Sequence, residues 1–211
     1  MKIFLAKLQK FGIKRAFIYV LIAVAAKIIV LLYKIIFSDN SPDTEGAIIV
    51  QATQFIGKGA IKIKGAQLGV WPSPYLISGC GYIEARSATS FIDIGKSSLL
   101  NNNFVIIADR SSIKIGERCL IGPNFFITDS DFHGLEPENR TNGNYRCLPV
   151  VIENDVFIGE GVKVMKGVTV GQGSVIGTGS VVVRNIEPFS VYAGVPAQKI
   201  NDIKVDCHFN Y

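Results

Sequence analysis

A histidine stands where a repeating pattern of aliphatic residues breaks off. Aliphatic residues recur every six positions at Ile115, Ile121 and Ile127, and His133 occupies the next position in this count. The segment 133–149 (HGLEPENRTNGNYRCLP) is polar and contains Gly, Asn and Pro, which is typical of a projecting loop. An imidazole held where a rigid scaffold meets a loop is well placed to act as a general base near neutral pH. The alternative is a surface histidine at the start of a loop.

Other chemistry-bearing residues form weaker patterns. Asp129 and Asp131 come shortly before His133, where a carboxylate can orient an imidazole, although turns also favour such residues. No two cysteines have metal-ligand spacing, and their scarcity indicates a reducing compartment without disulfides. The four are Cys80, Cys119, Cys147 and Cys207. The only other histidine, His208, is expected at the surface, and two histidines are too few for a three-His zinc site in one chain, so we expect no metal.

The composition excludes two broad classes. The chain has 211 residues, of which 48% are hydrophobic and 18% are charged, so wholesale disorder is excluded. The net charge of +5 owes much to basic residues within positions 1–15. These are Lys2, Lys7, Lys10, Lys14 and Arg15. The remainder is close to neutral and has no basic stripe interleaved with aromatic residues, which argues against nucleic acid as a partner.

The elements that must position His133 follow from a six-residue repeat. Read in sixes, the first positions are Ile152, Ile158, Val164, Val170, Ile176 and Val182, and the fifth are Val156, Val162, Val168, Ser174, Ser180 and Ile186. Earlier runs are Ile94–Leu100–Ile106 and Ile115–Ile121–Ile127, with a weaker one at Val50, Ile56 and Leu68 that Lys62 interrupts. The step of nine residues from Ile106 to Ile115 predicts a bulge or short insertion, and Cys119 at a fifth position predicts a core residue.

This period fits neither an amphipathic helix nor a simple strand. It fits a chain that turns every six residues, so that each aliphatic side chain points inward and stacks on its equivalent eighteen residues later. Val and Ile suit short strands, and the ends of such a stack need caps. The sequence therefore predicts an all-β fold, a parallel β-helix of hexapeptide repeats.

The N-terminal segment has a different character. Residues 16–37 are apolar except for Lys27 and Lys34. This segment is long enough to cross a bilayer as a helix. Lys27 would then lie near mid-bilayer, at a cost of about 2.5–3.5 kcal/mol. Because the two lysines are seven residues apart, they share a helix face, which favours a helix lying in the membrane interface. A spanning helix and a helix packed on the protein itself are the alternatives, while a signal peptide fits poorly.

The expected organisation has three parts. Residues 1–45 form a hydrophobic, basic helix and a polar linker, residues 46–203 form the β-helix with a loop at 133–151, and residues 204–211 form a tail. Trp71 lies in a Pro-flanked insertion, which we expect to cap the early coils, the alternative being a contribution to a neighbouring subunit's acceptor site. Glu84 and Arg86 are expected to form a structural pair.

The repeat region resembles the left-handed β-helix acyltransferases, and most closely the sugar O-acetyltransferases, a branch that includes maltose, galactoside and polysaccharide O-acetyltransferases. Three segments carry the resemblance: 100–107 (LNNNFVII), 121–133 (IGPNFFITDSDFH), and 152–200, which ends in SVYAGVPAQKI. The resemblance implies a homotrimer with active sites between subunits. It also implies acetyl-CoA as acyl donor, with no metal, and His133 as the base that deprotonates an acceptor hydroxyl.

The resemblance assigns further roles by position. Asn103 is expected at the catalytic centre, with Asn101, Asp109 and Asp131 near the acceptor, although a ladder of stacked asparagines at coil turns explains the Asn run equally well. The expected acetyl-CoA contacts are Phe157, Glu160, Gly177, Thr178, Arg184, Ala193, Gln198 and Lys199. Relatives often carry Arg where this chain has Gln198 and Asn201, which weakens the expected contacts with the phosphates of acetyl-CoA. The alternative for the basic residues Lys163, Lys166 and Arg184 is that they are solvated side chains at the corners of the coils.

These observations predict an acetyl-CoA-dependent O-acetyltransferase of sugars or glycans, and we expect it to act in surface polysaccharide synthesis. We expect it in the cytoplasm, peripheral on the inner face of the cytoplasmic membrane, which it would contact through residues 1–37. N-acetylation of a nucleotide-linked amino sugar or an antibiotic, and a non-catalytic β-helix scaffold, are the alternatives. The sequence leaves open the acceptor, the hydroxyl and the acyl length.

Overall fold

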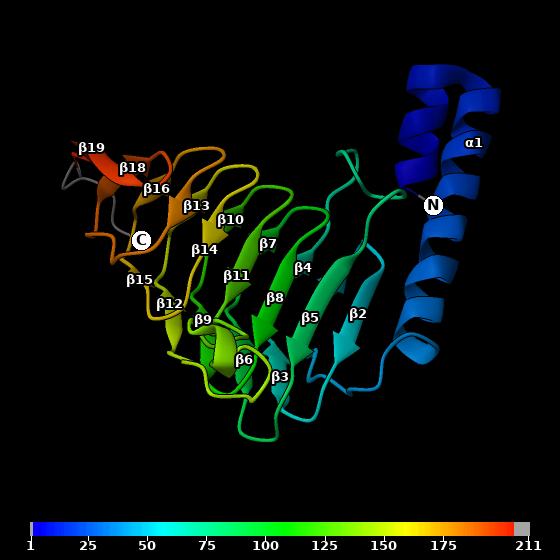
Figure 1. The fold of residues 1–211 in the computed structure, drawn as a ribbon. Coiled ribbons are helices and arrows are strands. Elements are labelled where there is room, and N and C mark those ends of the chain that lie inside the picture. Colours follow the sequence, from blue (N-terminus) through cyan, green and yellow to red (C-terminus); the bar gives the residue numbers. More distant parts are fainter. Residues whose placement is uncertain (1, 205–211) are drawn as a thin grey trace.

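The computed structural model describes residues 2–204, with side chains from residue 17 onward. One helix, α1 (Lys2–Ile35), is followed by nineteen short strands and a single 3-10 turn, η1 (Pro137–Asn139). Figure 1 shows the strands wound into a stack of coils, with α1 beside the first coil and the C-terminal strands at the opposite end. The expectation for His208 lies outside the described residues.

The strands form three sheets, one along each face of the stack. The first sheet contains β1 (Ile48–Ile49), β4 (Gln67–Leu68), β7 (Leu99–Leu100), β10 (Leu120–Ile121), β13 (Phe157–Ile158), β16 (Val175–Ile176), β18 (Ser190–Ala193) and β19 (Gln198–Asp202). The second contains β2 (Thr53–Ile56), β5 (Gly81–Ala85), β8 (Val105–Ala108), β11 (Phe126–Thr128), β14 (Lys163–Val164) and β17 (Val181–Val182). The third contains β3 (Ala60–Ile63), β6 (Phe91–Ile94), β9 (Ser112–Ile115), β12 (Val150–Ile152) and β15 (Thr169–Val170). The named pairs are parallel except β18 with β19, which confirms the predicted parallel β-helix. Its left-handed sense stays a prediction.

The core is a set of stacked aliphatic columns. Ile121, Ile158 and Ile176 are aligned on successive coils of the first sheet, and each is at most 2% exposed. All six predicted first positions from 152 to 182 are buried, as are all six predicted fifth positions. Ser174 and Ser180 are tolerated inside because their hydroxyls donate to the carbonyls of Gly171 and Gly177, at 2.7 and 2.6 Å. The hexapeptide pattern is therefore confirmed in these coils.

The weaker N-terminal pattern is wrong at two positions. Val50 and Ile56 are only partly buried, whereas Phe55 and Ile61 fill the core. For Ile56 the reason is that β2 and β3 are four residues long, so alternation along each strand decides which side chains point inward, whereas Val50 lies just after β1. Lys62 points outward between buried Ile61 and Ile63, and therefore does not interrupt the core.

Both ends of the stack are closed by other elements. At the N-terminal end, the backbone amides of Asp39 and Asn40 donate to the carbonyl of Phe55, and the Asn40 amide side chain donates to the carbonyls of Gly57 and Gly59. At the C-terminal end, β19 turns back antiparallel on β18. Such ends shield the outermost strands from further pairing.

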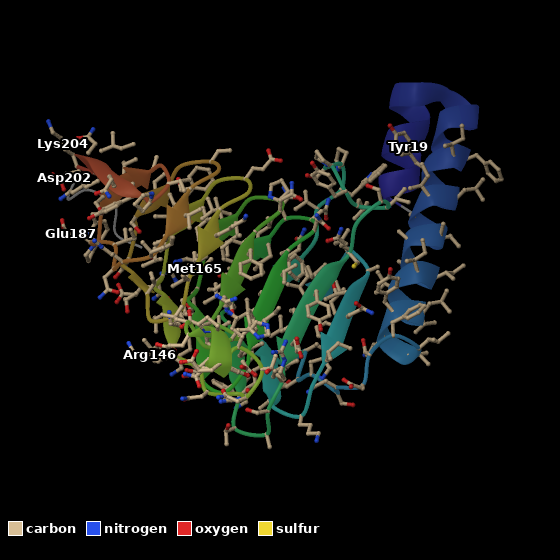
Figure 2. The ribbon with its side chains drawn as sticks, in the orientation of Figure 1. Tyr19, Arg146, Met165, Glu187, Asp202 and Lys204 are labelled. Carbon is tan, nitrogen blue, oxygen red and sulfur yellow. The ribbon has the colours of Figure 1, made fainter. Side chains whose placement is uncertain are left out.

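The helix α1 keeps a largely exposed apolar surface. Its segment Phe17–Ile35 is long and apolar enough to cross a membrane, with a mean hydropathy of 2.3, and none of that window is buried. Figure 2 shows Tyr19 labelled near the upper end of the helix. One face of α1 lies toward the first coil, while residues such as Leu21 and Ile28 on the opposite face are more than half exposed.

Candidate active site

His133 lies in a loop that leaves the stack after β11 and returns at β12. Leu148 donates its amide to the carbonyl of Asp129 at 2.8 Å, and Asp131 donates to the carbonyl of Arg146 at 3.1 Å. Ser130 and Cys147 form an antiparallel bridge between these bonds. The neck of the loop is thus closed by backbone pairing, which holds His133 close to the rigid coils.

The hydrogen bond of the His133 ring fixes which nitrogen is available for chemistry. Its Nδ1 lies 2.6 Å from the carbonyl oxygen of Arg140, and the side chain is otherwise exposed. A carbonyl oxygen only accepts, so Nδ1 carries the proton and the neutral ring presents the lone pair of Nε2. A base needs this arrangement, with one nitrogen anchored and the other free.

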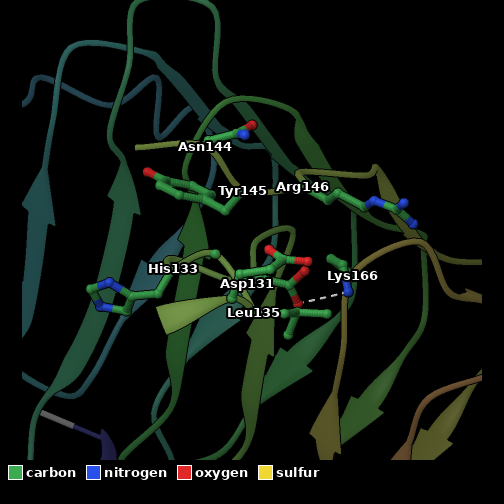
Figure 3. A pocket seen from close by; sticks show the side chains of 9 residues that line it. Asp131, His133, Leu135, Asn144, Tyr145, Arg146 and Lys166 are labelled. Atoms are coloured by element: carbon green, nitrogen blue, oxygen red, sulfur yellow. Dashed lines mark ion pairs between the residues drawn. The ribbon is translucent and has the colours of Figure 1, made fainter. Parts of the chain in front are cut away.

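A pocket of about 410 Å³ opens beside this imidazole (Figure 3). It is lined by Asp131, His133, Gly134, Leu135, Glu136, Asn144, Tyr145, Arg146 and Lys166. Lys166, from the corner after β14, forms an ion pair of 2.7 Å with Asp131, which ties the loop to the next coil. The wall is mostly polar, with hydroxyl, amide, carboxylate and cationic groups that suit hydrogen bonding to a hydroxyl-rich ligand.

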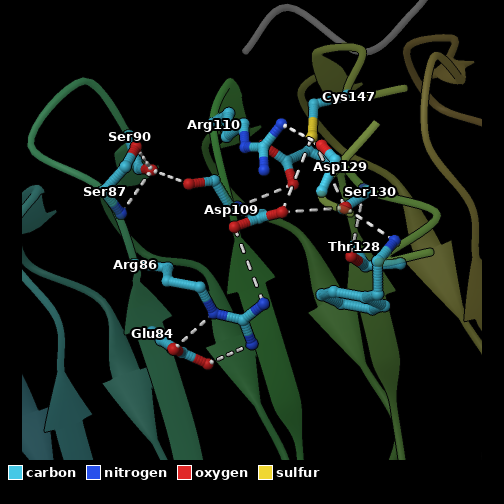
Figure 4. Close-up of polar contacts among 12 residues, drawn as sticks. Glu84, Arg86, Ser87, Ser90, Asp109, Arg110, Thr128, Asp129, Ser130 and Cys147 are labelled. Carbon is cyan, nitrogen blue, oxygen red and sulfur yellow. Dashed lines mark hydrogen bonds and ion pairs between the residues drawn. The ribbon is translucent and has the colours of Figure 1, made fainter. Parts of the chain in front are cut away.

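A polar network joins buried carboxylates and a buried serine to the exposed Arg86 side chain (Figure 4). Arg86 forms two hydrogen bonds with the Glu84 carboxylate, of 2.8 and 3.1 Å, which confirms the predicted pair. The same guanidinium lies 3.6 Å from the Asp109 carboxylate, which accepts a hydrogen bond of 3.0 Å from the Ser130 hydroxyl. Ser130 in turn accepts the amide of Phe132, at 2.9 Å.

This network holds the residue next to His133 from two sides. The Arg86 guanidinium lies 5.1 Å from the centre of the Phe132 ring, a cation–π contact. Phe132 also has a φ of 61°, an uncommon backbone conformation for a bulky residue, which the surrounding contacts must maintain. Arg86 therefore connects the second sheet to the loop that bears His133. Sequence reasoning paired Arg86 with Glu84 but contained no signal for its contact with Phe132.

Asp109 and Asp129 are both buried within the network. Asp129 accepts the backbone amides of Asp109 and Ser111, each at 2.7 Å, which explains the nine-residue step as a longer corner between β8 and β9. Burial raises the pKa of the Asp129 carboxyl, and those two amides oppose the rise. Burial also raises the pKa of the Cys147 thiol, which disfavours the thiolate that a covalent acyl intermediate on Cys147 would need. Asp109 is 2% exposed, and its carboxylate contacts Arg86 and Ser130.

The asparagine run lies at a different corner of the stack, between β7 and β8. The Asn103 side-chain amide donates to Asn124 at 2.7 Å, and the Asn124 amide donates to Glu160 at 3.2 Å, so these residues form a ladder along the coils. Asn102 is buried and donates to the carbonyls of Val70 and Pro74, which anchors the insertion around Trp71. The Asn101 side chain accepts the backbone amide of Asn102 at 2.7 Å, and the Asn101 backbone amide donates to the carbonyl of Ile121.

One chain does not bring Asn103 and His133 to the same corner. The ladder follows the edge between the first and second sheets, whereas the His133 loop leaves the edge between the second and third. Asp131, by contrast, lies with His133 in the same pocket. The residues expected around one active site are therefore split between two edges of the stack.

The residues expected to contact acetyl-CoA lie mainly on the first sheet and its C-terminal end. Phe157 projects outward from β13 and is 49% exposed, and Glu160 and Thr178 lie on the ladder edge of successive coils. Gly177 packs so closely against Ala193 that an added Cβ would lie 2.8 Å from the alanine methyl. Arg184 is exposed just after β17.

The C-terminal hairpin accounts for the last two expected contacts. Gln198 is exposed on β19, and Lys199 beside it forms ion pairs with Glu187 and Asp202, at 2.6 and 2.7 Å. These pairs raise the pKa of Lys199 above its usual range, through the hydrogen bond to Asp202 first and that to Glu187 second. A phosphate at Lys199 would compete with both carboxylates. Within the described part of the chain, no group of three His, Cys, Asp or Glu residues is placed to hold a metal ion.

Comparisons with known proteins agree with this architecture. Residues 149–184 match the family model "Bacterial transferase hexapeptide (six repeats)". The galactoside O-acetyltransferase of Escherichia coli K12 is 40% identical over 114 residues, 54% of this chain and 55% of that protein. The chain thus spans about half the length of the curated relatives it matches.

Solved structures share the fold over a larger part of the chain. The polysialic-acid-specific acetyltransferase NeuO is 25% identical, with a TM-score of 0.54 over 77% of this chain and 69% of that one. A hexapeptide-repeat acetyltransferase from Vibrio cholerae O1 biovar eltor, solved with acetyl coenzyme A, is 24% identical, with a TM-score of 0.53 over 87% of each chain. In its stacked coils and buried hexapeptide positions, the repeat region is similar to the hexapeptide-repeat acetyltransferases.

Proposed function

We propose that the protein transfers an acetyl group from acetyl-CoA to a hydroxyl group of a sugar or glycan. The observation that carries this proposal is the His133 ring, anchored through Nδ1 and free at Nε2 beside a polar pocket of about 410 Å³. Support comes from the similarity to a galactoside O-acetyltransferase and to a polysialic-acid-specific acetyltransferase. A scaffold would have no use for an anchored imidazole at the mouth of such a pocket.

The proposed reaction is direct transfer. Nε2 of His133 accepts the proton of the acceptor hydroxyl while its oxygen attacks the thioester carbonyl. The C–S bond then breaks, the acetyl ester forms, and the coenzyme A thiolate takes a proton from the imidazolium. No covalent intermediate on the protein is required, which agrees with the raised pKa of the nearby Cys147 thiol.

We place the complete active site between subunits of a homotrimer. The outward side chains of the first sheet include Leu120 and Phe157, which are 53% and 49% exposed, whereas the third sheet carries outward Lys62, Asp93 and Lys114. Exposed apolar side chains on one face favour contact with another subunit. Such contact is the simplest way to join the Asn103 ladder of one subunit to the His133 loop of another.

We further propose that the protein works on the cytoplasmic side of the membrane, where surface polysaccharides are assembled. The support is the exposed apolar face of α1, for example Leu21 and Ile28 at 52% and 53% exposure, while its other face lies on the first coil. That packing favours a helix lying in the interface over one that spans. Flotation with anionic vesicles tests this, with Ile28→Glu expected to lower binding and Lys58→Glu, on an exposed coil corner, as the control.

The experiment that tests the reaction measures thiol release from acetyl-CoA by the purified full-length protein. Acceptors are a panel of neutral sugars, acidic glycans, amino sugars and lipid-linked glycans. Acceptor-dependent release that falls in His133→Ala but not in Glu138→Ala, an exposed change in the same loop, would support the proposal. Equal release by both variants would contradict the role of His133, and release only with amino sugars would move the assignment to N-acetylation.

A further inference from the structure

A second pocket, far along the chain from the His133 loop, lies between α1 and the first two coils. We infer that it binds the hydrocarbon chain of an anionic lipid, with the lipid phosphate beside Lys27. The inference stands apart from acetyl transfer, because the residues that carry it lie outside the site described above. It defines what α1 does beyond resting on a membrane surface.

The walls of this pocket are apolar on both sides. Its volume is about 420 Å³, within the range of about 300–1,000 Å³ typical of small-molecule sites. The helix contributes Tyr19, Ile22, Ala23, Ala26, Lys27 and Val30, and the coils contribute Ile48, Ile49, Val50, Trp71 and Leu76. Besides the Lys27 ammonium, the Tyr19 hydroxyl and the Trp71 indole N–H, the described lining side chains are hydrocarbon, so the pocket suits a hydrocarbon rather than a sugar.

Small residues create the space. The lining positions of α1 follow helical spacing, and two of them, Ala23 and Ala26, have only a methyl group where the neighbouring turns carry large side chains. Across the gap, Trp71 is 40% exposed and lies edge-on to Tyr19, with ring centres 6.4 Å apart. The insertion that carries Trp71 is held rigidly by Asn102, so this wall is preformed.

Charge identifies the kind of lipid. Among the side chains that the structure describes, Lys27 is the only charged one lining the pocket, and Lys34 lies two turns further along the same side of α1. Within residues 17–204, no carboxylate forms an ion pair with either lysine. An ammonium group at the rim of an apolar pocket complements a phosphate attached to an alkyl chain.

The chain contains a single tryptophan, which makes the inference directly measurable. A bromine atom quenches tryptophan fluorescence only at short range, so we would titrate the full-length protein with 11-bromoundecyl phosphate below its aggregation concentration. We expect saturable quenching of Trp71. Inorganic phosphate alone should neither quench nor compete, which separates a lipid from a free phosphate.

Two matched pairs of variants test the site. Ala26→Leu fills the pocket and should weaken quenching by about tenfold, whereas Ala25→Leu, exposed on the outer face, adds the same hydrophobicity and should leave it unchanged. Lys27→Gln should weaken the phosphate probe by about fivefold but not 11-bromoundecanol, because only the phosphate meets the ammonium. Lys64→Gln, an exposed lysine outside the pocket lining, is the control.

Three outcomes would overturn the inference. These are quenching that does not saturate, equal quenching in Ala26→Leu and Ala25→Leu, and equal loss for the phosphate and the alcohol in Lys27→Gln. The first two would assign the probe to the outer face of α1. None of them bears on thiol release with soluble sugars, so this inference and the proposed reaction fail independently.

Discussion

Two regions of the stack are built on the same hexapeptide repeat but are stabilised by different interactions. One is the set of coils at residues 152–186, and the other is the corner below the His133 loop. In the C-terminal coils, buried aliphatic columns such as Ile158 and Ile176 occupy one position per turn, and the corners are short. Below the loop, the corner between β8 and β9 is longer, and it buries Asp109 and Asp129, with the partly exposed Arg86 guanidinium beside Asp109. The regular coils gain stability from apolar burial, whereas the irregular corner uses buried charge to hold a loop.

The two regions differ in what their buried residues cost in free energy of folding. A buried carboxylate is expensive unless hydrogen bonds and opposite charge compensate it. Valine at these two buried positions would be less costly to stability than aspartate. The two aspartates are therefore expected to serve a purpose other than stability. The adjacent His133 loop supplies that reason, since the network fixes Phe132, its immediate neighbour.

The largest expected effect separates the two regions by activity. His133→Ala should reduce acceptor-dependent thiol release by about 10²–10⁴-fold, because it removes the base. The midpoint of thermal unfolding should stay close to that of the parent protein, since the side chain is exposed and makes one hydrogen bond. A matching loss of thermal stability would show that the loop is part of the structural core after all.

The opposite effect is expected in the regular coils. Ile158→Ala should lower the free energy of unfolding by about 2–5 kcal/mol, because it leaves a cavity in a fully buried column. Turnover per folded molecule should be unchanged at a temperature where the variant is folded. Urea denaturation followed by circular dichroism gives the first quantity, and the thiol assay gives the second. If Ile158→Ala lost turnover without losing stability, the regular coils could not be assigned a purely structural role.

Two arginines with similar geometry sharpen the comparison. Arg86 donates two hydrogen bonds to the Glu84 carboxylate, and Arg118 donates two to the Asp155 carboxylate, at 2.6 and 2.8 Å. Lysine cannot reproduce two parallel bonds, so Arg86→Lys should let Phe132 shift and lower kcat by roughly tenfold to a hundredfold. The KM for acetyl-CoA should not change, which identifies Arg86 as a positioning residue. Arg118→Lys should leave kcat intact, and a similar loss in both variants would argue against positioning.

The smallest expected effect is a pH dependence of stability. Because the pKa of Asp129 is raised in the folded state above its ordinary value of 3.8, the folded protein retains this proton to higher pH than the unfolded chain does. The contribution of Asp129 to the free energy of unfolding therefore falls as pH rises from 3.8 through the raised pKa.

Asp129→Asn removes this titration while keeping the shape of the side chain. The stability advantage of the parent over Asp129→Asn should therefore shrink across that interval and level off above it. Urea denaturation at a series of pH values measures the difference, with Asp93→Asn on the outward face of β6 as the control. An advantage that grows with pH would mean that the backbone amides outweigh burial.

How much the sequence could predict follows the same division. The hexapeptide positions predicted the C-terminal coils residue by residue, since one aliphatic side chain per turn is a local signal. The first coil was harder, because Phe55 and Ile61 become buried through alternation within longer strands. The ion pair between Lys166 and Asp131 joins a coil corner to a loop and leaves no local pattern. The separation of Asn103 from His133 required the order of strands in three sheets.

The closure of both ends has a consequence for how the molecule behaves in a crowded cell. A stack of parallel strands is an open template, and without its linker and its final hairpin each terminal coil could recruit another chain, as a growing fibril does. Asn40, by occupying the carbonyls of Gly57 and Gly59, acts as a terminator at one end, and the β18–β19 hairpin does so at the other. The length of the solenoid is thereby made finite, and adding or removing a whole eighteen-residue turn between the two terminators would change its height without exposing an edge.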